Sequence, residues 1–90
     1  MLNPKLVDIE PLVDYKLKLC YANGEKKIFD VTPYISGSWY SQLKDKNYFK
    51  TVHIIAGGTG IEWANGQDIA PHELYELSTF EYTSSPFTVK

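Results

Sequence analysis

The sequence predicts an α+β domain in which an antiparallel sheet of four or five strands carries two short helices. Two local patterns support this fold class. Residues 15–21, YKLKLCY, alternate between apolar and polar positions, which is the period of a half-buried strand. Asn23-Gly24 follows and favours a tight type I′ turn, so residues 26–31, KKIFDV, are expected to return as the partner strand. A length of 90 residues indicates one domain with a small core.

Further strands are predicted on both sides of this hairpin. Residues 5–13, KLVDIEPLV, form the first, and Pro11 places it at a bend or at a sheet edge because proline cannot donate to a ladder. Residues 48–56, YFKTVHIIA, are β-branched and apolar, which predicts another strand. The glycine-rich stretch 57–60 turns the chain, and residues 61–63 return.

The two helices are predicted at residues 39–45 and 71–78. Ser38 is a candidate N-cap for the first, and helical spacing directs Trp39 and Leu43 toward the core. A second Asn-Gly turn, at residues 65 and 66, leads toward the last helix. Pro71 suits the first turn of that helix, where its missing N–H has no partner to lose.

The domain is expected to span residues 1–78, with residues 79–90 as a C-terminal tail or an added strand. This segment, TFEYTSSPFTVK, carries more large apolar groups than a disordered tail usually holds. It therefore adds a strand to its own sheet or to a neighbour's, or it is held against the domain.

Composition argues against several classes of function. The net charge is −2 and all nine basic residues are lysine, so the arginines that usually read guanine or clamp phosphate are missing, and direct nucleic-acid binding is not expected. Cys20 is the single cysteine, which fits a reducing cytoplasm, and it is expected to act as a small buried hydrophobe. No segment approaches the length of apolar chain that spans a membrane, about 20 residues.

Motifs with catalytic associations are incomplete here. His72-Glu73 lacks the second histidine one turn later that a zinc protease helix needs, because position 76 is glutamate. The glycine-rich stretch 57–60 leads into a predicted strand, whereas phosphate loops lead into helices. Asp30 and Asp68 are expected to bond nearby backbone at strand ends and turns. We therefore expect no catalytic residue, no metal and no cofactor.

Aromatic residues are numerous for so small a core. Most of them are expected to be buried, and the rest to form an apolar face of the kind that binds a partner. The candidate interaction surface consists of Trp39, Tyr40, Tyr48, Phe80, Tyr82 and Phe87.

A longer pattern of residues resembles a known family. It comprises Leu17-x-Leu19, Asn23-Gly24-Glu25, Phe29-Asp30-Val31-x-Pro33, Gly37-x-Trp39, Leu43-x-Asp45, Phe49-x-x-Val52 and Ile61-x-Trp63-x-Asn65-Gly66-x-Asp68-Ile69-x-Pro71-x-x-Leu74-Tyr75. Over residues 5–78 the chain resembles the bacterial domain of unknown function 2442. The resemblance implies a small mixed α and β fold like the N-terminal domain of a two-part bacterial protein whose second domain is a helix-turn-helix. It also implies an antitoxin-like or regulatory role beside small toxin-like partners, and it transfers no catalytic residue.

The leading functional hypothesis is a non-catalytic protein-interaction or regulatory module, such as an antitoxin-like partner of a small toxin, which could also form a homodimer. One alternative is a DNA-linked transcriptional regulator domain without its helix-turn-helix. A lysine stripe on one sheet face would favour that alternative. The other is a small ligand-binding protein or enzyme that uses His53, His72 or the carboxylates. A deep pocket with His72 beside Asp68 would favour that one.

Overall fold

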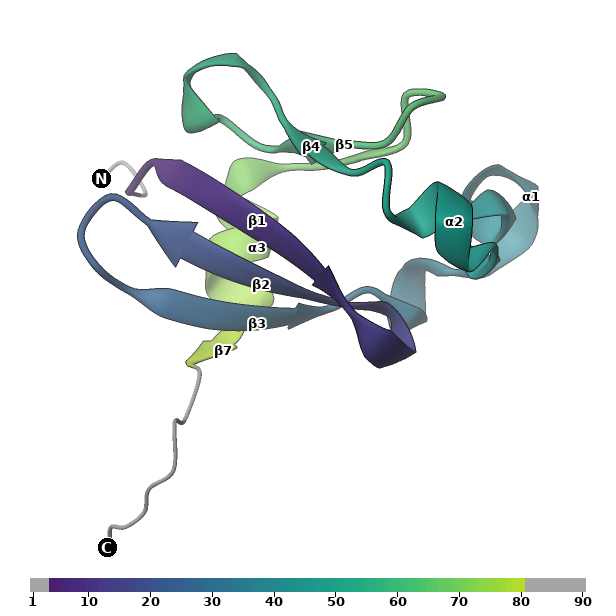
Figure 1. Cartoon of the computed structure of the whole chain (residues 1–90), viewed down its shortest axis with the longest axis horizontal. Coiled ribbons are helices and arrows are strands. Elements are labelled where there is room, and N and C mark those ends of the chain that lie inside the picture. Colours follow the sequence, from purple (N-terminus) through teal and green to yellow (C-terminus); the bar gives the residue numbers. More distant parts are fainter. Residues whose placement is uncertain (1–3, 81–90) are drawn as a thin grey trace, which may run out of the picture.

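The computed structural model describes residues 4–80, which form two antiparallel sheets and several short helices (Figure 1). The larger sheet has the order β1-β2-β3-β7 and the smaller one the order β4-β5-β6. The first comprises β1 (Leu6–Leu12), β2 (Lys16–Tyr21), β3 (Lys26–Asp30) and β7 (Thr79–Phe80), and the second β4 (His53–Ile54), β5 (Ile61–Glu62) and β6 (Asp68–Ile69). The α+β class with a four-stranded antiparallel sheet is confirmed, and the second sheet is an addition to it.

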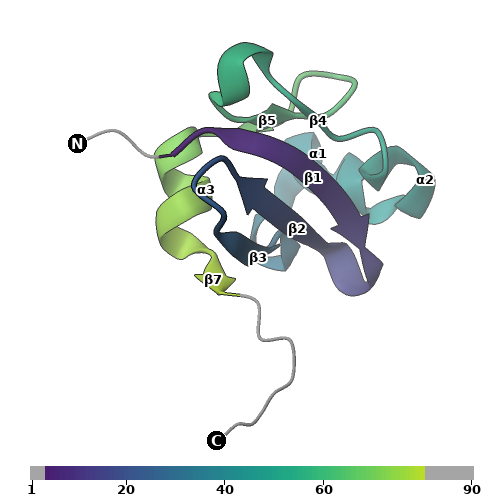
Figure 2. The same ribbon diagram turned by 60° about the vertical axis from the view of Figure 1, so that its left-hand side comes forward.

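Short helices connect and cover the sheets. The α-helices are α1 (Gly37–Tyr40), α2 (Lys46–Phe49) and α3 (Pro71–Leu77), and single 3₁₀ turns occur at Val13–Tyr15, Thr32–Tyr34, Ser41–Lys44 and Ala56–Gly58. Figures 1 and 2 show α3 against one face of the larger sheet, β4 and β5 next to β1, and α1 and α2 together at one end of the molecule. The prediction that Pro71 begins a helix is confirmed.

The core lies between the larger sheet, the helices and the smaller sheet. Strand β2 supplies Leu17 and Leu19 on its inner face, and Phe29 lies opposite Leu17 on β3, as the alternating pattern predicts. The buried apolar set is Leu6, Leu17, Leu19, Tyr21, Phe29, Val31, Leu43, Phe49, Ile61, Trp63, Ile69 and Leu74. Cys20 faces the other side of β2 and is half-buried, so the expectation of a buried cysteine is wrong.

The segment between the hairpin and the second sheet differs from its prediction. Residues 39–45 do not form one helix, because α1 ends at Tyr40 and a 3₁₀ turn follows; α1 also begins at Gly37, ahead of the predicted cap. Asp45 then accepts hydrogen bonds from the backbone N–H groups of Asn47 and Tyr48 and starts α2. The first residues of the predicted strand 48–56 are therefore helical, and only His53 and Ile54 of that range form a strand, β4.

The turn after β2 is a wider one than predicted. Gly24 N–H donates to the Tyr21 carbonyl oxygen and Tyr21 N–H to that of Glu25, both at 2.9 Å, which encloses a three-residue loop. Gly24 has φ of 93°, whereas Asn23 is not among the residues with positive φ. A type I′ turn needs positive φ at both central residues, so the loop is a type I turn followed by a glycine bulge. The hairpin itself is confirmed.

Candidate functional site

A buried glutamine lies at the end of the β5–β6 hairpin loop and joins it to the helical end of the molecule. Gln67 is fully buried. Its Nε2 donates to the Trp39 carbonyl oxygen and to Gln42 Oε1, each at 2.9 Å, and its Oε1 accepts from the Tyr48 hydroxyl at 2.5 Å. Both N–H donors and the carbonyl oxygen of this amide thereby have partners on the helical segment 37–49, as a buried polar group requires.

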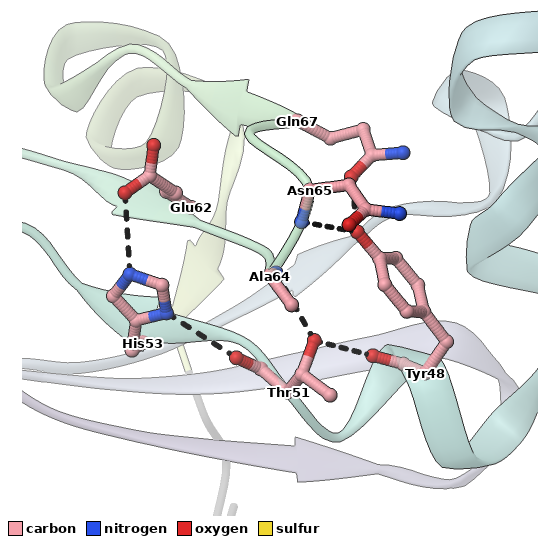
Figure 3. Close-up of polar contacts among 7 residues, drawn as sticks. All are labelled: Tyr48, Thr51, His53, Glu62, Ala64, Asn65 and Gln67. Carbon is pink, nitrogen blue, oxygen red and sulfur yellow. Dashed lines mark hydrogen bonds and ion pairs between the residues drawn. The ribbon is translucent and has the colours of Figure 1, made fainter.

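The tip of the same hairpin is fastened to α2 and to the residues after it (Figure 3). Asn65 N–H donates to the Tyr48 hydroxyl at 2.7 Å, and Asn65 Nδ2 donates to Gln42 Oε1 at 3.0 Å. Ala64 N–H donates to Thr51 Oγ1 at 3.2 Å, and this hydroxyl donates to the Tyr48 carbonyl at 2.8 Å. We call Gln42, Tyr48, Asn65 and Gln67 the amide cluster.

Trp63 anchors this arrangement from the core. Its side chain is fully buried, and its indole N–H donates to the Phe49 carbonyl oxygen at 2.9 Å. The two rings also pack with their centroids 5.9 Å apart. The hairpin is therefore held to α2 by an apolar contact below the amide cluster as well as by the cluster itself.

Trp39 is the exposed aromatic at this end of the molecule. Its side chain is 53% exposed although its carbonyl is bound by buried Gln67, so the expectation that Trp39 faces the core is wrong. Leu43 is buried as expected. Trp39 and Leu43 do not share a face because α1 is followed by a 3₁₀ turn, in which residues three apart, and not four apart, lie on the same face.

The remaining members of the predicted interaction surface fall into different places. Tyr40 and Tyr48 are half-buried. The Tyr40 hydroxyl donates to the carbonyl of Asp68 in β6 at 3.1 Å, and the Tyr48 hydroxyl donates to Gln67, which also binds the Trp39 carbonyl. Phe80 belongs to β7, on the larger sheet. Tyr82 and Phe87 lie outside the described residues. The structure thus places Tyr40 and Tyr48 at the same end of the molecule as Trp39 and places Phe80 on the larger sheet.

Phe80 covers a buried lysine. Lys27 lies on the inner face of β3 and is 5% exposed. Its ammonium group donates to the Tyr75 carbonyl at 2.6 Å in the last turn of α3, and it lies 4.0 Å from the centre of the Tyr75 ring and 4.8 Å from that of Phe80. A cation at a helix C-terminus and over aromatic rings is stabilising. Phe80 therefore has a structural contact of its own, and nothing in the local sequence indicated it.

The motif His72-Glu73 takes part in packing. Glu73 accepts a hydrogen bond from the Tyr34 hydroxyl at 2.6 Å, and burial first, then this bond, raises the pKa of Tyr34 to about 12. His53 pairs with Glu62 at 3.2 Å on the surface of the second sheet (Figure 3). Within residues 4–80, no three histidine, cysteine or acidic side chains are grouped to hold a metal ion.

Charges on the outer face of the larger sheet alternate in sign. Lys16 lies opposite Asp30, and Lys18 lies opposite Glu10. The Asp30 carboxylate accepts from Thr32 N–H at 2.9 Å, as predicted, and this hydrogen bonding is the main cause of its lowered pKa, with a smaller contribution from Lys16. The two β2 lysines thus meet acidic neighbours, which is unlike a phosphate-binding stripe.

The pockets and helices bear on the enzyme and membrane alternatives. Two pockets, one beside the Val13–Tyr15 turn and one beside Leu77, have neither histidine in their linings. None of the helices among residues 4–80 has the length and apolar character needed to cross a membrane.

Comparison with known proteins identifies a family. No curated protein and no solved structure matches the chain. The profile of a family described as "Protein of unknown function (DUF2442)" matches residues 6–80, which include every described strand and helix. The matched range extends from β1 through the Trp63–Gln67 loop, as the resemblance over residues 5–78 predicts, and it also includes β7. The chain therefore belongs to the DUF2442 family.

Proposed function

We propose that this protein is a non-catalytic interaction module that binds a protein partner through a surface centred on Trp39. The main support for the proposal is that Trp39 has an exposed side chain on a fixed backbone. Its indole is 53% exposed, while its backbone carbonyl is fixed by the fully buried Gln67. A large exposed aromatic on an immobilised backbone loses little conformational entropy on binding, which favours affinity.

Neighbouring side chains reinforce this position. Tyr40 is tied to the Asp68 carbonyl and Tyr48 to Gln67, so two tyrosines at the same end of the molecule are held by hydrogen bonds from their hydroxyls. Tryptophan and tyrosine are the side chains most often found at the energetic centre of protein interfaces. The proposed surface is thus centred on an exposed tryptophan whose backbone carbonyl is hydrogen-bonded to a buried side chain.

We propose a small toxin-like protein as the partner class, with a second copy of this chain as the alternative. The acidic net charge and the β2 lysines that lie opposite carboxylates favour a protein over a nucleic acid. The single cysteine suits a reducing cytoplasm as the place of action.

The experiment is co-purification of the tagged full chain from its native host, with Trp39→Ala as the test variant and Leu77→Ala as the matched control. Leu77 is 62% exposed and lies at the end of α3, outside the amide cluster. We expect the wild-type chain and the Leu77→Ala variant to recover a stoichiometric partner, or a dimer by sedimentation, and Trp39→Ala to lose it. Both variants should unfold at the wild-type temperature, because surface truncations change stability by less than about 0.5 kcal/mol. Recovery of the partner by Trp39→Ala, or of monomer alone by the wild type, would refute the proposal.

A further inference from the structure

A pocket of about 240 Å³ lies between the Val13–Tyr15 turn and α2, away from the amide cluster. Its walls include Pro11 and Leu12 from the end of β1 and the ring of Phe49 from α2, and they are more apolar than polar. A space of this size admits one large side chain or one aromatic ring, and it is smaller than most sites for drug-sized ligands, which start at about 300 Å³.

The turn that forms one wall is held in an uncommon conformation. Asp14 and Tyr15 have φ of 62° and 60°, and they are the non-glycine residues with positive φ within residues 4–80. Left-handed backbone at a non-glycine residue costs about 1–3 kcal/mol and persists where surrounding contacts determine it. Such conformations cluster at binding sites and clamps, which makes this wall a candidate for function.

Contacts of Tyr15 hold the turn in this left-handed conformation. Its carbonyl oxygen accepts from Val31 N–H at 2.9 Å, and its hydroxyl donates to the Lys44 carbonyl at 2.5 Å. Its ring meets Phe49 edge-on, with the centroids 5.5 Å apart. The wall is therefore fixed to the residue after β3, to the helical segment and to Phe49 in the pocket lining, and the pocket exists before anything binds.

The charges around the pocket differ from those of the whole chain. Lys46 and Lys50 are exposed, line the pocket and are four residues apart, so they lie on one side of the helical turn. Asp14 is the acidic residue in the lining, which leaves an excess of one positive charge in a chain whose net charge is −2. Val13, also in the lining, is 82% exposed.

We infer that this pocket is an anchor site for an acidic peptide segment of a partner, which inserts one aromatic or large aliphatic side chain between the turn and α2 and pairs its flanking carboxylates with Lys46 and Lys50. The apolar walls account for the inserted side chain, and the two ammonium groups select its neighbours. The site does not depend on Trp39, so the failure of one proposal leaves the other standing.

The test is a titration of the ¹⁵N-labelled full chain with the peptide Ac-Glu-Glu-Phe-Glu-Glu-NH₂, followed by two-dimensional amide NMR spectra. We expect saturable shifts at residues 11–15 and 46–50. The peptides Ac-Glu-Glu-Ala-Glu-Glu-NH₂ and Ac-Lys-Lys-Phe-Lys-Lys-NH₂ should bind at least about tenfold more weakly, because each lacks one half of the proposed recognition. Shifts elsewhere, or equal affinity for all three peptides, would overturn the inference.

Charge-reversal variants distinguish the effect of the pocket lysines on peptide binding from the effect of the net charge of the chain. Lys46→Glu/Lys50→Glu should weaken binding of the acidic peptide by about tenfold or more, and should restore binding of the lysine peptide. Lys5→Glu/Lys26→Glu makes the same change in net charge at exposed positions outside the pocket and should leave the affinity unchanged. Equal losses in both variants would mean attraction by net charge alone and would refute the site.

A titration with phenylacetate tests whether the occupant is a peptide or a small molecule. If phenylacetate bound as tightly as the acidic peptide, a peptide would be excluded as the occupant.

Discussion

The β2–β3 and β5–β6 hairpins carry nearly the same loop sequence in different surroundings. Residues 21–25 read YANGE and residues 63–67 read WANGQ. In each loop the glycine N–H donates to the carbonyl of the first residue at 2.9 Å, and the N–H of the first residue donates to the carbonyl of the fifth, at 2.9 Å in one and 2.8 Å in the other. Gly24 and Gly66 have φ of 93° and 98°. The Ala-Asn-Gly sequence thus specifies one backbone geometry twice.

The fifth residue shows how far the two loops differ. Glu25 is partly exposed, and its carboxylate accepts from Asn23 at 2.8 Å and from the Tyr75 hydroxyl at 2.5 Å. The bond from Tyr75 is the main cause that lowers the pKa of Glu25. Gln67 instead is fully buried and bonds three partners on the helical segment.

The first residues of the two loops also differ in their hydrogen bonding. Trp63 is buried with its indole N–H bonded to Phe49, whereas the buried Tyr21 hydroxyl has no hydrogen-bond partner within residues 4–80. Loop geometry is therefore a local property, and the role of a loop depends on what its two ends meet. The β2–β3 loop meets Tyr75 of α3 through Tyr21 and Glu25, while the β5–β6 loop binds the helical end that presents Trp39.

Changing the fifth residue of each loop to its counterpart in the other is expected to give the largest difference between the two loops. Gln67→Glu should lower the free energy of unfolding by about 4 kcal/mol at neutral pH, because a buried carboxylate would face the Trp39 carbonyl and Gln42 Oε1, both acceptors. Glu25→Gln should change stability little, since the amide keeps an acceptor for the Tyr75 hydroxyl. Urea denaturation of both variants measures the difference.

The pH dependence of Gln67→Glu checks the cause. Burial raises a carboxyl pKa in the folded state, so the folded protein holds the proton longer than the unfolded chain. Stability relative to wild type should therefore fall as pH rises from about 4, the ordinary carboxyl value, to the raised pKa, and it should be largely recovered below about 4. A loss independent of pH would indicate a change in packing in place of buried charge.

Trp63→Phe probes the first position of the buried loop. The change removes the indole N–H, leaves the Phe49 carbonyl without that donor and opens a cavity beside a fully buried ring. We expect a loss of about 3 kcal/mol, the sum of an unpaired buried acceptor and lost packing, measured by thermal and urea denaturation.

Trp39→Phe is the matched control for that variant. The same chemical change at an exposed tryptophan should alter stability by less than about 0.5 kcal/mol. Similar losses in the two variants would mean that Trp39 is part of the core after all, and would remove the contrast on which the interaction surface rests.

These contrasts also mark what the sequence could predict. Alternation in β2, the Asn-Gly signal and Pro71 are local patterns, and the hairpin and α3 followed from them. The helical turn at α2 had a local signal in Asp45, whose carboxylate caps it, but the β-branched run after it dominated the interpretation. The first residues of the predicted strand are helical, and the hydrogen bond from the Trp63 indole to the Phe49 carbonyl is a tertiary contact at this helix end that local sequence does not reveal.

Residues of the candidate site were less accessible to sequence reasoning. Gln67 and Lys27 are polar types that normally lie at the surface, and their burial depends on partners distant in sequence, such as Gln42, which is 25 residues from Gln67, and Tyr75, which is 48 residues from Lys27. One signal was present and was missed, namely that Ala-Asn-Gly occurs twice with an aromatic before it and an acid or amide after it. Trp39 was placed inward because its exposure depends on where α1 turns into a 3₁₀ turn.

Tyr21→Phe tests the first position of the other loop, and it is the variant that we expect to gain stability. Removing a buried hydroxyl that lacks a partner should raise the free energy of unfolding by up to about 1 kcal/mol, because its desolvation is not compensated. Burial raises the pKa of Tyr21 to about 12, so the wild type should lose stability as pH rises from the ordinary tyrosine value of about 10 toward 12. The variant should lose less over that interval, in denaturation curves recorded at each pH. A destabilised Tyr21→Phe would show that the hydroxyl is hydrogen-bonded in solution, and that the two loops are anchored more alike than their surroundings indicate.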